Sequence, residues 1–117
     1  MGMQAVACVI MNRVRIARAR YGMPHPLYGD GSFTACCWQK WQFSCWNETD
    51  VNRSGVLNIT SSNSYFQQAL AIANLAVDGQ LKDITNGSTH YHSSDITPYW
   101  TSSLTRNGII GNHIFYA

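Results

Sequence analysis

The stretch GMQAVACVIMNRV, residues 2–14, decides how this chain folds. Apolar residues recur along it and just beyond it at steps of three or four, which is the spacing of one helical face. They are Met3, Val6, Ile10, Val14 and Ala17. The sequence Gly22-Met23-Pro24-His25-Pro26 follows, and proline cannot continue a helix because it has no backbone N–H to donate. We therefore expect a helix over residues 3–20.

The middle of the chain predicts a short helix, a loop and a second long helix. Ser32 is placed to cap a short helix that starts at Phe33. Residues 47–63 are rich in Asn, Ser and Thr and are expected to form a long loop. A second amphipathic helix is expected over residues 64–78, and Gly79 ends it.

The last third of the chain carries the signals for strands. Asn86-Gly87 is typical of a hairpin-type turn. Residues 89–92 and 109–116 are short strand candidates. Two main helices followed by short late strands predict an α+β fold. The length of 117 residues suits a single domain over residues 1–117.

The composition excludes several classes of protein. Hydrophobic residues are 45% of the chain, too many for intrinsic disorder, yet no apolar run approaches the roughly 20 residues that a membrane helix needs. Residues 1–20 do not form a secretory signal, because their arginines follow the apolar stretch. A net charge of +2 is too small for a strong nucleic-acid field. We expect neither membrane insertion nor nucleic-acid binding, and the export route stays open.

The polar surface indicates the kind of partner. Charged residues are 12% of the chain, about half the usual share, and Ser, Thr, Asn and Gln supply hydrogen-bonding groups instead. Such a surface suits uncharged polar partners such as glycans. Four arginines between positions 13 and 20 make one end of the first helix positive. They are interpreted as a solvated helix end, with docking on an anionic polymer as the alternative.

The cysteines do not predict a metal or redox site. Cys8 lies on the apolar helical stretch and is interpreted as a buried small hydrophobic residue. No two cysteines form a CxxC pair, so neither zinc nor a thioredoxin-type site is indicated. A bridge from Cys36 or Cys37 to Cys45 stays open, and so does the redox compartment. We expect no metal and no cofactor.

The segment WQFSCW, residues 41–46, carries candidate binding residues. If the segment is extended, Gln42, Ser44 and Trp46 share one face of it. Their amide, hydroxyl and indole groups suit a sugar, because pyranose rings stack on indoles while their hydroxyls bond to amides. A packed aromatic core is the alternative.

The segment THYH, residues 89–92, carries a second set. His90 and His92 are expected on one face of a strand, and His113 is a candidate to join them. An HxH pair without an HExxH motif does not specify zinc. Hydrogen bonding to substrate or to backbone is the expected role.

Two catalytic alternatives follow from single residues. A thiol nucleophile paired with a histidine would serve a peptidase or amidase, but the cysteines near the tryptophans sit in surroundings that raise a thiol pKa. Glu48 is the one glutamate of the chain, and it lies in a polar stretch beside Asp50. A two-carboxylate glycosidase needs an acid in an apolar pocket, so Glu48 is a weak basis for that reaction.

Three segments, in order, resemble the SleB/CwlJ-type cell wall hydrolases, the family that includes the spore cortex-lytic enzymes. The first is residues 2–14, whose Asn12-Arg13 is similar to the end of the family's first helix. The second is residues 42–46. The third is residues 83–116, which contain His90-Tyr91. The resemblance covers nearly the whole chain, and the order of the segments is more specific than any one of them.

The resemblance implies a lysozyme-like, lytic-transglycosylase-related fold and cleavage of the glycan strands of peptidoglycan. In this family a lone glutamate protonates the glycosidic oxygen and then assists attack by the muramic 6-hydroxyl. That glutamate lies just before the segment that matches Gly2 to Val6. We therefore expect this chain to be truncated at its N-terminus relative to the family and to have weak activity or none, and no residue of it is assigned as catalytic.

The resemblance also implies which residues contact the glycan. The expected substrate-binding residues are His90, Tyr91, Gln42, Ser44, Trp46 and Trp100, with His113 as a further candidate. The leading function is a peptidoglycan-cleaving domain of a bacterium or phage that acts on the cell wall. The alternative is a noncatalytic module that binds cell-wall glycan, which would bind walls without lysing them.

Overall fold

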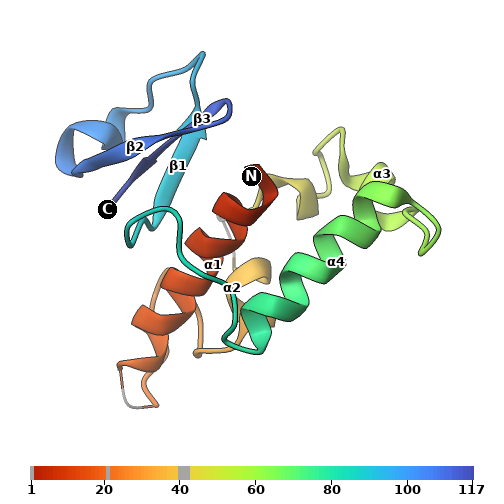
Figure 1. Ribbon diagram of the computed structural model, residues 1–117, viewed down its shortest axis with the longest axis horizontal. Helices are drawn as coiled ribbons and strands as arrows, with labels where there is room; N and C mark the ends of the chain where they lie inside the picture. Colours follow the sequence, from red (N-terminus) through yellow and green to blue (C-terminus); the bar gives the residue numbers. More distant parts are fainter. Residues whose placement is uncertain (1, 21, 40–42) are drawn as a thin grey trace.

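The computed structural model describes residues 2–20, 22–39 and 43–117 (Figure 1). Helix α1 (Gly2–Arg18) runs through the middle, with α4 (Ser64–Val77) on one side and a small sheet on the other. The shorter helices are α2 (Phe33–Trp38), α3 (Arg53–Leu57) and the 3-10 helices η1 (Ser44–Trp46) and η2 (Tyr99–Ser103). The strands are β1 (His90–Ser93), β2 (Arg106–Ile110) and β3 (His113–Tyr116).

The three strands are antiparallel, in the order β1-β3-β2. The predicted strand over residues 109–116 is two strands in the structure. The chain reverses between them at Gly111, whose φ of +58° lies in the left-handed region that glycine adopts easily. The helices and this late sheet together form the α+β arrangement that the sequence predicts.

The core lies where α1 meets the sheet. Ala5 and Val9 of α1 pack against Phe115 of β3, and all three are buried. Ile84, Tyr91 and Ile110 are partly buried around them. Cys8 is fully buried, as the sequence predicts, and it adds to the sheet-facing side of the helix. The hydrophobic core of the domain is therefore centred on the contact between α1 and β3.

The predicted apolar stripe of α1 needs a correction. Met3 is exposed, and Val6 and Ile10 are only half-buried. These residues line an open groove of about 530 Å³ between α1 and α4, to which His113 of β3 also contributes. Val14 and Ala17, the last two residues of the predicted stripe, are buried as the sequence predicts, so the correction applies only to its first part.

Two predicted signals at helix ends, the Ser32 cap and the Gly79 stop, are confirmed. Ser32 accepts a hydrogen bond from the backbone N–H of Ala35 at 3.1 Å and so caps α2. Asn63 caps α4 in the same way. Gly79 follows α4 with a φ of +73° and donates its N–H back to the Ala76 carbonyl.

Two expectations about the middle of the chain are wrong. Residues 47–63 are not one loop, because α3 forms within them and Asn58 caps its end through backbone hydrogen bonds to Ser54 and Val56. Residues 44–46 are not extended, since they form the 3-10 helix η1. The alternation of faces predicted for an extended segment therefore does not apply to Ser44 and Trp46, and Trp41 and Gln42 lie outside the described residues.

The side chains of Asn12 and Arg13 join α1 to the chain that leads into β1. Asn12 Nδ2 donates to the Ser88 carbonyl at 2.9 Å and to Asp83 Oδ2 at 3.1 Å. Arg13 Nε donates to the Thr89 carbonyl at 2.7 Å. Both side chains are buried, with 2% and 7% of their surface exposed. We call these bonds the Asn-Arg latch.

Asp83 holds the turn that the latch contacts. Its Oδ1 accepts from the backbone N–H and the hydroxyl of Thr85, and its Oδ2 also accepts from the N–H of Gly87. Burial raises the pKa of Asp83, but these bonds outweigh burial and lower it. Asn86 and Gly87 have φ values of 55° and 78°, yet the turn joins a loop to β1 and not two strands.

Replacing Asn12 by alanine should lower the free energy of unfolding by about 2–3 kcal/mol, because it removes the buried donor of the Ser88 carbonyl and one of the two donors of Asp83 Oδ2. Urea denaturation measures the change. Asn74→Ala, at an exposed position of α4, is the matched control. It should be neutral or slightly stabilising, because alanine favours helices more than asparagine does. Equal effects of the two substitutions would contradict the latch.

Candidate functional site

One face of β1 carries a cluster of aromatic and imidazole rings. Side chains alternate along a strand, and His90 and His92 lie on the same face, as the sequence predicts. Trp100 of η2 packs against both, with ring centroids 5.2 Å from His90 and 5.7 Å from His92. Tyr116 of β3 completes the group, 5.4 Å from Trp100. We call these four residues the ring cluster.

Within the ring cluster, His92 has a structural role. Its Nδ1 lies 2.7 Å from the Ser93 carbonyl, which can only accept, so Nδ1 carries the proton. Its Nε2 then accepts from the Tyr116 hydroxyl at 2.9 Å. The residue is buried. Both ring nitrogens are thus engaged within the protein, and His92 fixes β1 to β3.

His90 is half-buried and therefore more exposed than His92, the other histidine of the ring cluster. Its Nδ1 lies 2.9 Å from the Thr89 hydroxyl. Burial lowers the pKa of His90, and the positive charge of Arg13 lowers it further. The imidazole is therefore neutral at pH 7 and can exchange hydrogen bonds with an uncharged ligand.

Tyr91 points to the opposite face of β1. Its ring lies 5.3 Å from His113 and 5.8 Å from Phe115. His113 also lines the groove between α1 and α4. The structure therefore separates Tyr91 and His113 from His90 and Trp100 by the thickness of the sheet, although the sequence pairs His90 with Tyr91.

A pair of stacked indoles lies on the helical part. Trp46 of η1 stacks on Trp38 at the end of α2, with centroids 4.3 Å apart and planes 21° apart. Trp38 keeps 60% of its surface exposed. We call these two residues the indole pair. The sequence predicts a role for Trp46 and not for Trp38, although the density of aromatic residues over 33–46 could have indicated it.

Arg13 lies between the indole-bearing segment and the sheet. Its guanidinium carbon is 5.5 Å from the Tyr28 ring centroid and 6.0 Å from that of Phe43. Burial lowers the pKa of Arg13, and the neighbouring tyrosines and thiols partly offset this. The sequence predicts that Arg13 belongs to a solvated helix end. This prediction is wrong for Arg13, because its side chain is buried.

The acids and thiols of the described residues do not form a catalytic pair. Hydrogen bonds from serine hydroxyl and backbone groups lower the pKa of Asp30 and Asp95, whereas a general acid for glycoside cleavage needs a raised one. Glu48 is exposed in a turn. Burial raises the pKa of Cys36 to about 11 and also raises that of Cys37, which disfavours the thiolate that a nucleophile requires.

Two further properties bear on the kind of site. Among residues 2–20, 22–39 and 43–117, no three histidine, cysteine or carboxylate side chains gather as metal ligands would. The helices in this part of the chain include none that is long and apolar enough to cross a membrane.

Comparison with known proteins gives a family and a fold. A family model described as Cell Wall Hydrolase matches residues 1–116. Two similar solved structures are the catalytic domain of the germination-specific lytic transglycosylase SleB from Bacillus anthracis and that of the Bacillus cereus SleB protein. Each is 22% identical with a TM-score of 0.63, and the match covers 99% of this chain and 78% and 74% of theirs. The expected fold is confirmed. A search of curated proteins finds no match.

Replacing His90 by glutamine should reduce the loss of stability in acid. The pKa of His90 is lower in the folded state than its ordinary value of about 6.5. The unfolded chain therefore binds more protons as the pH falls below about 6.5, and the free energy of unfolding decreases. Urea denaturation at pH 7.5 and pH 5 measures this decrease, which should be smaller in His90→Gln than in the unaltered chain. The same decrease in both proteins would contradict the buried position of His90.

Proposed function

The chain belongs to the cell wall hydrolase family, and from that premise we propose that it binds and cleaves the glycan strands of peptidoglycan. The observation that carries the proposal is the family match over residues 1–116. The sequence supports it independently, because the surface is rich in hydrogen-bonding side chains and poor in charge. The wall is accordingly the proposed place of action.

The indole pair and the ring cluster are the proposed contacts with sugar. Trp38 offers an exposed ring, and the C–H groups of a pyranose pack well against an aromatic face. His90 and Trp100 offer an imidazole and a second indole at the sheet. Tyr91, which lies on the other face of β1, is also proposed to contact the glycan.

Gln42 and Ser44 remain proposed contacts on the strength of the sequence resemblance. Gln42 lies outside the described residues, and Ser44 begins η1, next to the turn of chain that carries Trp46. Their amide and hydroxyl groups are of the kind that hydrogen-bond to sugar hydroxyls. The glycan would then meet an aromatic face and polar groups together.

The general acid is the part of the mechanism that the described residues do not supply. Asp83 is saturated with hydrogen bonds and ionised, and Asp30 and Asp95 are exposed with lowered pKa values. We propose that cleavage follows the family's lone-glutamate mechanism. A positioned general acid contributes about 100- to 10,000-fold in rate.

The proposal is tested by cosedimentation with purified peptidoglycan and by the fall in turbidity of a peptidoglycan suspension. We expect the chain to cosediment. A fall in turbidity would show cleavage. Binding with no fall in turbidity would favour the glycan-binding module. Absence of binding would contradict both functions.

Replacing Trp38 by alanine should weaken binding to soluble glycan fragments about fivefold, since an aromatic stacking contact is worth about 1 kcal/mol. Tyr65→Ala, at an exposed aromatic residue on α4, is the control and should bind as the unaltered chain does. Quenching of tryptophan fluorescence or an NMR titration measures the dissociation constants. An equal effect of both substitutions would exclude a specific role of the indole pair.

A further inference from the structure

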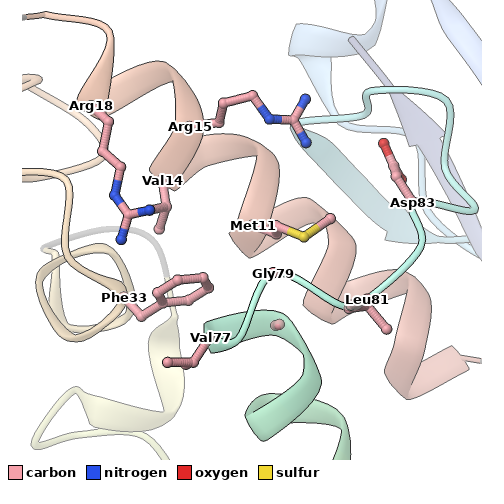
Figure 2. Close-up of a pocket in the computed structure, with 10 residues that line it drawn as sticks. Met11, Val14, Arg15, Arg18, Phe33, Val77, Gly79, Leu81 and Asp83 are labelled. Carbon is pink, nitrogen blue, oxygen red and sulfur yellow. The ribbon is translucent and has the colours of Figure 1, made fainter.

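A cavity of about 350 Å³ opens at the C-terminal half of α1, as Figure 2 shows. It is bounded by α1, by the start of α2 and by the end of α4 with the chain that follows. Arg15 and Arg18 of α1 line it, the Arg18 guanidinium on the side of Phe33 and the Arg15 guanidinium on the side of Asp83. Its apolar lining includes Met11, Val14, Val77 and Leu81. We call it the arginine cavity.

Arg18 is held in place by two contacts. Its Nε donates to the Gly31 carbonyl at 2.8 Å, and its guanidinium carbon lies 5.9 Å from the centre of the Phe33 ring (Figure 2). Gly31 has a φ of +97°, and a Cβ at this position would lie 2.9 Å from Arg18 Cγ. The close approach therefore requires glycine. The Nη groups of Arg18 keep their donors for a ligand.

Arg15 is oriented by the Asn-Arg latch. Its Nη2 donates to Asn12 Oδ1 at 2.9 Å, and the same amide uses its nitrogen to bond Ser88 and Asp83. The partners of Arg15 and Arg18 are thus an amide oxygen, a carbonyl oxygen and a ring, all of them neutral. Among residues 2–20, 22–39 and 43–117, no carboxylate bonds to either of these two cations that line the cavity.

Two features of the lining are negative and would repel an anion. Each of them already accepts hydrogen bonds from other groups of the protein. Asp83 is negative, but its two oxygens together accept four hydrogen bonds from Thr85, Gly87 and Asn12. The carbonyl end of α4 is also negative, but it accepts backbone N–H groups from residues 78–81. Neither feature directs free acceptor lone pairs at the arginines, which leaves the guanidinium groups as the available ligand-binding groups.

We propose that the arginine cavity binds the terminal carboxylate of a short peptide that ends in a small aliphatic residue. The inference rests on the proposed function, because the glycan strands of peptidoglycan carry such peptides. The guanidinium fork matches a carboxylate with two parallel hydrogen bonds. The methyl groups beside that carboxylate pack on Met11, Val14, Val77 and Leu81.

The apolar lining distinguishes this ligand from other anions. A free phosphate or a wall phosphodiester would bond to the guanidinium groups equally well, but it would leave the apolar half of the cavity unfilled. A neutral sugar would not use the charge of the two guanidinium groups. A volume of about 350 Å³ lies at the small end of ligand-binding pockets, which suits one or two small residues.

The test is an NMR titration of the full chain with N-acetyl-D-alanyl-D-alanine, its C-terminal amide and inorganic phosphate. We expect the carboxylate peptide to bind, with the amide and phosphate each at least tenfold weaker. Arg18→Gln and Arg15→Gln should each weaken the peptide at least tenfold. Arg20→Gln removes an equal charge at an exposed position beyond α1 and should leave the affinity within twofold.

Each outcome has a definite meaning. Equal binding of peptide and amide, or of peptide and phosphate, would overturn the proposal, because charge or lining would then have no part in recognition. An equal loss in Arg20→Gln and Arg18→Gln would overturn it as well. Circular dichroism of each variant distinguishes loss of ligand binding from loss of fold. Val77→Asp, at an exposed position of the lining, leaves both arginines in place and should abolish binding, because its carboxylate repels that of the peptide.

This experiment does not depend on lysis of walls. If the peptide binds and walls neither bind nor lyse, the cavity stands and the glycan function fails. If walls bind through the indole pair and the free peptide does not, the glycan function stands and the arginine cavity fails.

Discussion

The hydrogen bonds that Asn12 and Arg13 make in the interior are the constraint on which the other parts of the domain depend. The apolar core at this junction is small, with Ala5, Val9 and Phe115 at its centre, so it does not by itself fix how α1 is rotated. Two neighbouring side chains that bond to the carbonyls of Ser88 and Thr89 do fix it. That rotation decides which residues of α1 meet the sheet, which meet α4, and which carry their charges toward solvent.

Local chemistry explains what the sequence predicts well. Helix α1 ends where glycine and proline follow it, and α2 begins at the Ser32 hydroxyl. The left-handed Gly79 ends α4. Each of these signals lies within a few residues of the feature that it determines, so one sequence suffices to read it. Helix α3 was missed because polar residues that favour loops also serve as its caps.

Contacts between distant segments explain what the sequence does not predict. In the sequence, Arg13 is one of four similar arginines. It is buried because Tyr28, Phe43 and Thr89, which are distant in the sequence, contact it in the fold. The candidate site shows the same limit. The sequence places His90 and His92 on one face of a strand, but it does not say that η2 will cover that face with Trp100. Exposure of Trp38 likewise depends on where η1 packs.

The two faces of β1 carry different sets of side chains, and this limits how the sequences of related chains can diverge. One face supplies His90 to the ring cluster, while Tyr91 on the other packs beside Phe115 and His113. Substitutions at either position alter one surface at a time. An insertion or deletion of a single residue inside the strand would exchange both sets of side chains at once. Homologues should therefore tolerate changes of residue type here far better than changes of length, which would accumulate in the loops that flank the strand.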